Sequence, residues 1–192
     1  MNTSHVKEEK VQLKTGYTTG SSATAASKAA LLSIINQKKI ENVDILLPKR
    51  SYVQIPIHSC EFKIDNASCS VIKNGGDDPD VTHGAEIIVE LSFTEKINEI
   101  EIDGGEGVGI VTKPGLGLEI NKPAINPVPK KMITENLREI GKEVLLEKGI
   151  KVVISVPKGK ELGPKTDNPR LGIMNGISIL GTSGIVIPFS TA

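Results

Sequence analysis

Three aspartates and a histidine crowd one short glycine-rich segment, residues 73–84, with the sequence KNGGDDPDVTHG. Like charges this close raise one another's pKa, which is one way to make a general acid or base. Carboxylate oxygens beside an imidazole can also hold a divalent metal, and Gly, Asp and Pro favour a plain solvated turn. Acid–base catalysis is the functional hypothesis, and the other two readings stay open. The candidate catalytic residues are Asp77, Asp78, Asp80 and His83.

A second segment, residues 15–27 (TGYTTGSSATAAS), places small hydroxyl residues at the start of a predicted helix. A helix N-terminus offers free N–H groups and the positive end of its dipole, so the segment favours binding of a carboxylate or a phosphate. Ordinary helix capping is the alternative. The segment also resembles the GLGSSA loop of the galactokinase and homoserine kinase family, which keeps a small-molecule kinase open as a function. The candidate substrate-binding residues here are Thr18, Thr19, Ser21 and Ser22.

Two further segments are rich in glycine, residues 104–129 and 169–188. Glycines permit close approach of a flat or anionic ligand to the backbone, while a wide hairpin is the structural alternative. Lys113 adds positive charge, and Arg170 is of the residue type best suited to bidentate binding of a carboxylate, although a single Arg near a turn is commonly a surface residue. The candidate cofactor-binding residues are Gly104, Gly105, Gly107 and Gly109.

The elements that must position these segments are predicted to be several short strands and two helices that lie far apart in the sequence. The first helix is predicted over residues 19–37, with Thr18 or Thr19 as N-cap, and the second over residues 129–148, stopped by Gly149. Residues 1–12 are predicted to form a flexible tail. Many short strands with two helices indicate the α+β class, with a mixed or antiparallel sheet. The predicted strands are residues 43–48, 52–57, 62–64, 69–72, 85–93, 97–102 and 152–156.

Composition narrows the class of protein further. The 192 residues carry 23 basic and 23 acidic side chains, but residues 73–106 hold 2 basic against 10 acidic ones, a balance of −8. A neutral domain is a poor candidate for binding nucleic acid. The sequence contains no apolar run long enough to span a membrane and begins with no secretory signal, which predicts a cytoplasmic protein. Cys60 and Cys69 are expected to be reduced packing residues rather than zinc ligands.

In this order, the motifs resemble the cobalt-precorrin-5B C1-methyltransferase family of anaerobic cobalamin biosynthesis. The resemblance runs from about residue 13 to the end and departs from the family in two respects. Ser22 stands where members commonly have Cys, and members are nearly twice as long. The resemblance therefore implies that residues 13–192 form an N-terminal α+β domain without the family's C-terminal Rossmann-like domain. The matching strings are GYTTGSS (16–22), KNGGDDPDVTHG (73–84), GGEGVGIVTKPG (104–115), PAINPVP (123–129) and residues 169–188.

The resemblance implies a fold, a reaction and roles for the candidate residues. The fold is expected to be similar to the second domain of ribosomal protein S5. The reaction transfers a methyl group from S-adenosylmethionine to C1 of a cobalt-containing tetrapyrrole, giving cobalt-precorrin-6A. Lys113, Arg170 and the hydroxyl cluster (Thr18, Thr19, Ser21 and Ser22) are then partners for the substrate's carboxylates. The acidic loop (residues 73–84) is suited to acid–base catalysis or to contact with the cationic sulfonium. Cobalt belongs to the substrate, so no protein metal site is expected. A non-catalytic tetrapyrrole-binding domain is the remaining alternative, and the oligomeric state is left open.

Overall fold

The computed structural model describes residues 13–188, and the tail predicted over residues 1–12 lies outside them. Its centre is a five-stranded sheet in the order β4-β5-β6-β9-β7. All neighbours pair antiparallel except β7, which runs parallel to β9. This mixed sheet with helices confirms the predicted α+β class. Its strands are β4 (Ser59–Phe62), β5 (Asn66–Ile72), β6 (Glu86–Thr94), β7 (Ile100–Gly104) and β9 (Gly149–Ser155).

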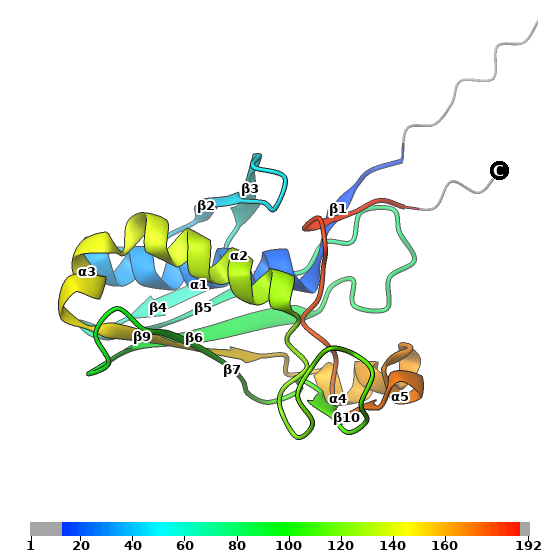
Figure 1. The fold of residues 1–192 in the computed structure, drawn as a ribbon. Coiled ribbons are helices and arrows are strands. Elements are labelled where there is room, and N and C mark those ends of the chain that lie inside the picture. The colour runs from blue at the N-terminus through cyan, green and yellow to red at the C-terminus, as the bar shows by residue number, and fades with distance from the viewer. Residues whose placement is uncertain (1–12, 189–192) are drawn as a thin grey trace, which may run out of the picture.

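Two helices, α1 (Thr19–Asn36) and α2 (Pro127–Ile140), cover one face of the sheet, while the other face is uncovered (Figure 1). Strand residues alternate accordingly, so that Ile87, Val89 and Leu91 of β6 are buried beneath the helices. The Ala-rich first half of α1 is buried on nearly all sides, because small side chains let this helix lie close to both β5 and α2.

The second predicted helix is divided at Gly141 into α2 and a short α3 (Lys142–Glu147). A Cβ atom at Gly141 would lie 2.8 Å from the Leu137 carbonyl oxygen and 2.9 Å from Leu31. A larger residue at this point would therefore press on the last turn of α2 and on the Leu31 side chain of α1. An apolar stripe alone cannot reveal such a break, since the stripe continues through it.

A hairpin of β2 (Asn42–Leu46) and β3 (Tyr52–Pro56) is attached to the helices through a polar cluster. The Asn136 side chain accepts from Leu46 N at 2.8 Å and donates to Leu46 O at 2.9 Å, as a neighbouring strand would. Lys28 Nζ donates to Glu139 Oε2 at 2.7 Å and lies 3.5 Å from Asn136 Oδ1. Tyr52 donates its hydroxyl to Glu139 Oε1 at 2.6 Å. The cluster joins α1, α2 and the hairpin.

Short elements from distant parts of the chain meet beyond one end of the sheet (Figure 1). The glycine-rich segments thus pack on each other and on the start of α1. Two antiparallel pairs hold them, β1 (Gly16–Tyr17) with β11 (Ile185–Val186), and β8 (Ile110–Val111) with β10 (Ile173–Met174). The remaining elements there are α4 (Gly159–Leu162), the 3-10 turn η1 (Gly163–Lys165) and α5 (Asn168–Leu171).

Two other expectations concern cysteines and membranes. Cys60 and Cys69 face each other across β4 and β5 as free, buried thiols, as predicted, and burial raises the pKa of Cys69. Within residues 13–188, no helix is both long and apolar enough to cross a bilayer.

Candidate functional site

A cavity of about 340 Å³ lies at the N-terminus of α1, where the acidic loop and the C-terminal segments meet. It draws its walls from four parts of the chain that are distant in sequence. Thr18 and Thr19 come from the start of α1, Lys73 and Asp80 from the acidic loop, and Asn168 from α5. The other lining residues are Thr82, Thr166, Asp167, Leu171, Ile177, Ser178, Leu180 and Val186.

The most buried charge in this cavity is the ammonium of Lys73, whose side chain is 2% exposed. Lys73 follows directly on β5, and its backbone pairs with Ala85 O and Gly84 N at the base of the acidic loop. Its Nζ donates to Asp80 Oδ2 at 2.5 Å. Sequence reasoning missed this lysine, because its position at the end of a strand carries no signal of burial. Its place inside the KNGG motif was the one available hint.

Asp80 is held in its ionised form. Burial of its carboxyl opposes ionisation, but hydrogen bonds from Lys73 Nζ, the Thr82 hydroxyl and the Thr82 amide outweigh that effect and hold the pKa of Asp80 below its usual value. The raised pKa expected from crowded carboxylates is therefore not found at Asp80. The physical reason is that an ammonium and two Thr82 donors contact this carboxylate directly.

The other predicted catalytic residues point to different partners. Asp77 Oδ2 accepts from Lys14 N at 2.7 Å, which pins the acidic loop to the segment entering β1. His83 is exposed, and its Nδ1 accepts from Gly75 N at 3.1 Å. Asp78 is half-buried. Within residues 13–188, no three His, Cys, Asp or Glu side chains converge as metal ligands would.

The hydroxyl cluster divides into two pairs. Thr18 and Thr19 line the cavity, whereas Ser21 and Ser22 are buried behind it with 0% and 1% exposure. Ser21 Oγ donates to Gly184 O at 2.6 Å, and Ser22 Oγ donates to Thr18 O at 3.1 Å. The two serines therefore shape the site without lining it.

The sequence predicted free N–H groups at the start of α1, but two of the first amides already donate to protein atoms. Gly20 N donates to Leu180 O at 3.0 Å, and Ser21 N donates to the N-cap Thr18 Oγ1 at 3.1 Å. The carbonyl of Leu180 and the N-cap hydroxyl therefore each use one of the amides that an anion would bind. This arrangement disfavours the kinase alternative, which needs those amides for phosphate.

Comparison with known proteins shows the family of the chain. The CbiD family model matches residues 6–188. The chain belongs to the CbiD family. It is 51% identical over 97% of its length to cobalt-precorrin-5B C(1)-methyltransferase from Priestia megaterium, and 53% identical over 96% to the enzyme of that name from Geobacillus kaustophilus. It covers 51% and 50% of those two proteins, so it spans about half the length of these relatives.

A crystal structure supports the same assignment. The cobalamin biosynthesis protein CbiD from Archaeoglobus fulgidus is 34% identical and aligns with a TM-score of 0.68. The alignment covers 92% of this chain and 55% of that one. The mixed α+β fold is thus shared with a CbiD protein, while likeness to ribosomal protein S5 stays a prediction.

The two predicted cationic residues of this CbiD chain lie away from the cavity lining. Lys113 is exposed, and its aliphatic stem lies against Gly172, just beyond α5. Arg170 is 87% exposed and lies 3.6 Å from Asp167, a residue of the cavity wall. Arg170 lies within α5 and Lys113 lies beside Gly172 at its end, and their role in binding substrate stays a prediction.

The four glycines predicted to bind a cofactor are explained by packing. A Cβ at Gly107 would lie 1.9 Å from Val156 O, and one at Gly105 would lie 2.3 Å from Ser155 Oγ. Gly104 and Gly109 are similarly closed by Pro123 and Ile173. Protein atoms therefore already occupy the space that a side chain at these glycines would need, and their binding of S-adenosylmethionine stays a prediction.

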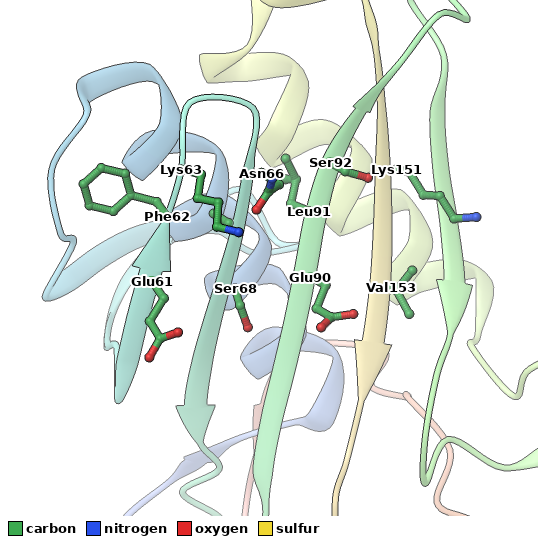
Figure 2. A pocket seen from close by; sticks show the side chains of 11 residues that line it. Glu61, Phe62, Lys63, Asn66, Ser68, Glu90, Leu91, Ser92, Lys151 and Val153 are labelled. Carbon is green, nitrogen blue, oxygen red and sulfur yellow. The ribbon is translucent and has the colours of Figure 1, made fainter.

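A second, larger hollow of about 680 Å³ lies on the uncovered face of the sheet (Figure 2). Its side chains come from alternate positions on neighbouring strands, among them Ser68, Glu90 and Lys151. Such alternation is the ordinary solvated face of an antiparallel sheet. None of the motifs that carry the CbiD resemblance reaches it, so the smaller cavity is the better candidate site.

Proposed function

We propose that this protein takes part in the S-adenosylmethionine-dependent methylation of C1 of cobalt-precorrin-5B, which gives cobalt-precorrin-6A in anaerobic cobalamin biosynthesis. The observation that carries the proposal is 51% to 53% identity, over nearly the whole chain, to proteins named for this activity. The cytoplasmic location expected from the sequence belongs to the same proposal.

The chemistry makes modest demands on the chain's own residues. When bound, S-adenosylmethionine supplies a sulfonium methyl whose carbon–sulfur bond breaks, leaving a neutral thioether, as the macrocycle carbon donates its electron pair. The protein must hold and orient the reactants rather than provide a covalent nucleophile. Ser22 fits this view, because its hydroxyl is buried and already donates to Thr18 O.

Among the predicted catalytic residues, Asp78 remains the candidate base for a macrocycle proton. Asp77 is engaged by Lys14 N, Asp80 by Lys73 and Thr82, and His83 Nδ1 by Gly75 N. We expect Asp78→Asn to lower turnover by about 100-fold with little change in stability. Asp77→Asn is the matched control, because it loosens the loop and should lower the melting temperature more than turnover. If Asp78→Asn loses stability and turnover together, this residue belongs to a structural turn.

The decisive experiment uses a chimera in which this chain replaces the matching half of the Priestia megaterium relative. Cobalt-precorrin-5B and methyl-labelled S-adenosylmethionine are added, and label is followed into the tetrapyrrole. Transfer by the chimera supports the proposal. Binding of the tetrapyrrole by a folded chimera, with no label transferred, would point instead to a non-catalytic binding domain.

A further inference from the structure

Lys73 has hydrogen-bonding capacity that the protein leaves unused. An ammonium carries three donor hydrogens. Within residues 13–188, Asp80 is the one hydrogen-bond partner found for Lys73 Nζ. The side chain is 2% exposed and lies in the cavity wall. Water-sized space next to a buried cation with free donors is the setting in which a ligand acceptor gains most.

The other polar groups of the wall are largely occupied by the protein. Thr19 Oγ1 lies 3.2 Å from Ser178 O and accepts from Leu180 N at 2.9 Å. Asn168 donates to Gly176 O and accepts from Ser178 Oγ. Asp167, the other acidic residue of the lining besides Asp80, is 81% exposed and lies 3.6 Å from Arg170. Unused donor capacity among the buried groups is therefore concentrated at Lys73, which makes it the point where the cavity selects an acceptor.

The rest of the lining sets the shape of that ligand. Leu171, Ile177, Leu180 and Val186 contribute aliphatic walls. The volume of about 340 Å³ is near the lower end of the range of roughly 300–1,000 Å³ for small-ligand sites. It accommodates a side arm or one end of a larger molecule. Leu171 and Leu180 are 47% and 46% exposed, so the apolar surface continues outward for the remainder.

We infer that this cavity binds a carboxylate carried on a short aliphatic stem, with Lys73 Nζ bridging the ligand carboxylate and Asp80. Thr82 continues to donate twice to Asp80, which keeps that carboxylate satisfied while Lys73 turns a second donor to the ligand. The biological source of the carboxylate rests on the proposed function. It is either an acidic side arm of the tetrapyrrole or the amino-acid end of S-adenosylmethionine, and both present the same chemistry to Lys73.

The test is a binding titration that involves no methyl transfer. The isotope-labelled 192-residue chain is titrated at neutral pH with 4-methylthiobutanoate, and amide NMR shifts of Thr82, Asn168 and Ser178 are followed. We expect saturable binding in the millimolar range. The matched amide, 4-methylthiobutanamide, should bind about tenfold more weakly or not at all, because it lacks the charge. L-methionine, which adds an ammonium, distinguishes the two sources: tighter binding than the butanoate assigns the cavity to the methyl donor, and equal or weaker binding assigns it to the tetrapyrrole arm.

Variants tie the result to Lys73. Lys73→Met alone leaves the Asp80 carboxylate without its cationic partner, which can destabilise the fold. The double variant Lys73→Met, Asp80→Asn removes both charges, so that neither is left unpaired. We expect the butanoate to lose at least about tenfold in affinity in both. Lys28→Met, at the buried lysine far from the cavity lining, should retain wild-type affinity. Equal binding of acid and amide, or unchanged binding in the folded double variant, would overturn the inference. A chimera that is inactive while this chain still binds the acid would overturn the proposed activity alone.

Discussion

Lys28 and Lys73 are both nearly withdrawn from solvent, each beside a carboxylate, yet their surroundings differ. Lys28 reaches Glu139 and Asn136, and the ring of Tyr52 lies 5.8 Å from its Nζ. Lys73 reaches Asp80 and otherwise faces a cavity. Burial of a lysine is thus not in itself a sign of function. The informative quantity is how many of its donors the protein has left unmet.

The difference extends to what each pair joins. The Lys28 cluster connects α1, α2 and the β2–β3 hairpin, so its loss should be felt as instability. The Lys73 pair lies in one loop, between residues seven positions apart. Its loss should be felt chiefly in binding. The following predictions test this division, from the largest expected effect to the smallest.

Asn136→Ala should be the most damaging substitution for stability. It removes the acceptor for Leu46 N and the donor for Leu46 O, leaving two part-buried backbone groups unpaired, and it also removes a second donor to Met132 O. We expect a loss of about 3 kcal/mol in the free energy of unfolding, measured by urea denaturation. Thr134→Ala, which removes an exposed hydroxyl on the same helix, should change it by less than about 0.5 kcal/mol. Similar changes in the free energy of unfolding for both variants would show that the cluster does not stabilise the contact between the hairpin and the helices.

Lys73→Met should lower methyl transfer by the chimera about 100-fold, because the ligand loses the group that positions it. Lys28→Met should lower turnover less than about threefold while lowering the melting temperature. If Lys73→Met does not fold, the double variant with Asp80→Asn gives the same comparison. Equal effects of the two lysines on turnover would erase the distinction drawn here.

Asp80→Asn should remove a pH-dependent part of the stability. The pKa of Asp80 is lowered on folding, so its carboxylate stabilises the native state above the unfolded pKa of 3.8, and this contribution is lost as pH falls through the lowered folded value. The stability difference between wild type and variant should therefore be largest near neutral pH and shrink under acid. Urea denaturation across that range measures it, and a difference that grows with acidity would contradict the assignment.

The smallest expected effect is a change in the titration of Tyr52 that Glu139→Ala makes visible in spectroscopy, in addition to the instability expected when Lys28 loses its carboxylate partner. The hydrogen bond that Tyr52 donates to Glu139 raises the pKa of the Tyr52 hydroxyl above its ordinary value. Removal of the carboxylate should bring that pKa back down, as followed by the ultraviolet absorbance of tyrosinate. Tyr52→Phe identifies which transition belongs to this residue. An unchanged transition would mean that Tyr52 and Glu139 do not interact in solution.

The sequence predicted the central elements well, because periodic burial leaves a local pattern. The first helix was expected to end at residue 37 and ends at Asn36, and the strand predicted over 85–93 is observed as Glu86–Thr94. Gly141 was missed because its break depends on the approach of Leu31 from another helix. The parallel pairing of β7 with β9 could not be predicted from local sequence either, because it depends on which strand edges of the sheet are unpaired when β7 is added.

The candidate site was predicted in part. Thr18, Thr19 and Asp80 do line one cavity, as their motifs suggested. Ser21 and Ser22 are buried behind the cavity, and the four glycines lie away from it. The sequence cannot show that Ser21 donates to Gly184 O, or that Val156 O lies where a side chain at Gly107 would be. Lys73 was missed for a related reason, since a strand-end lysine normally extends into solvent.

The pairing of β1 with β11 has a consequence for the newly made chain. Thr19 at the start of α1 and Leu180 in the cavity wall are separated by 161 residues. At translation rates of roughly 5–20 residues per second, the ribosome needs about 8–30 seconds to deliver the second after the first. During that interval the helix and most of the sheet have been synthesised, but the wall that closes around Lys73 has not. If the cavity binds a carboxylate as proposed, binding requires that synthesis has passed Val186, and a chain released early should lack the site however well its sheet is formed.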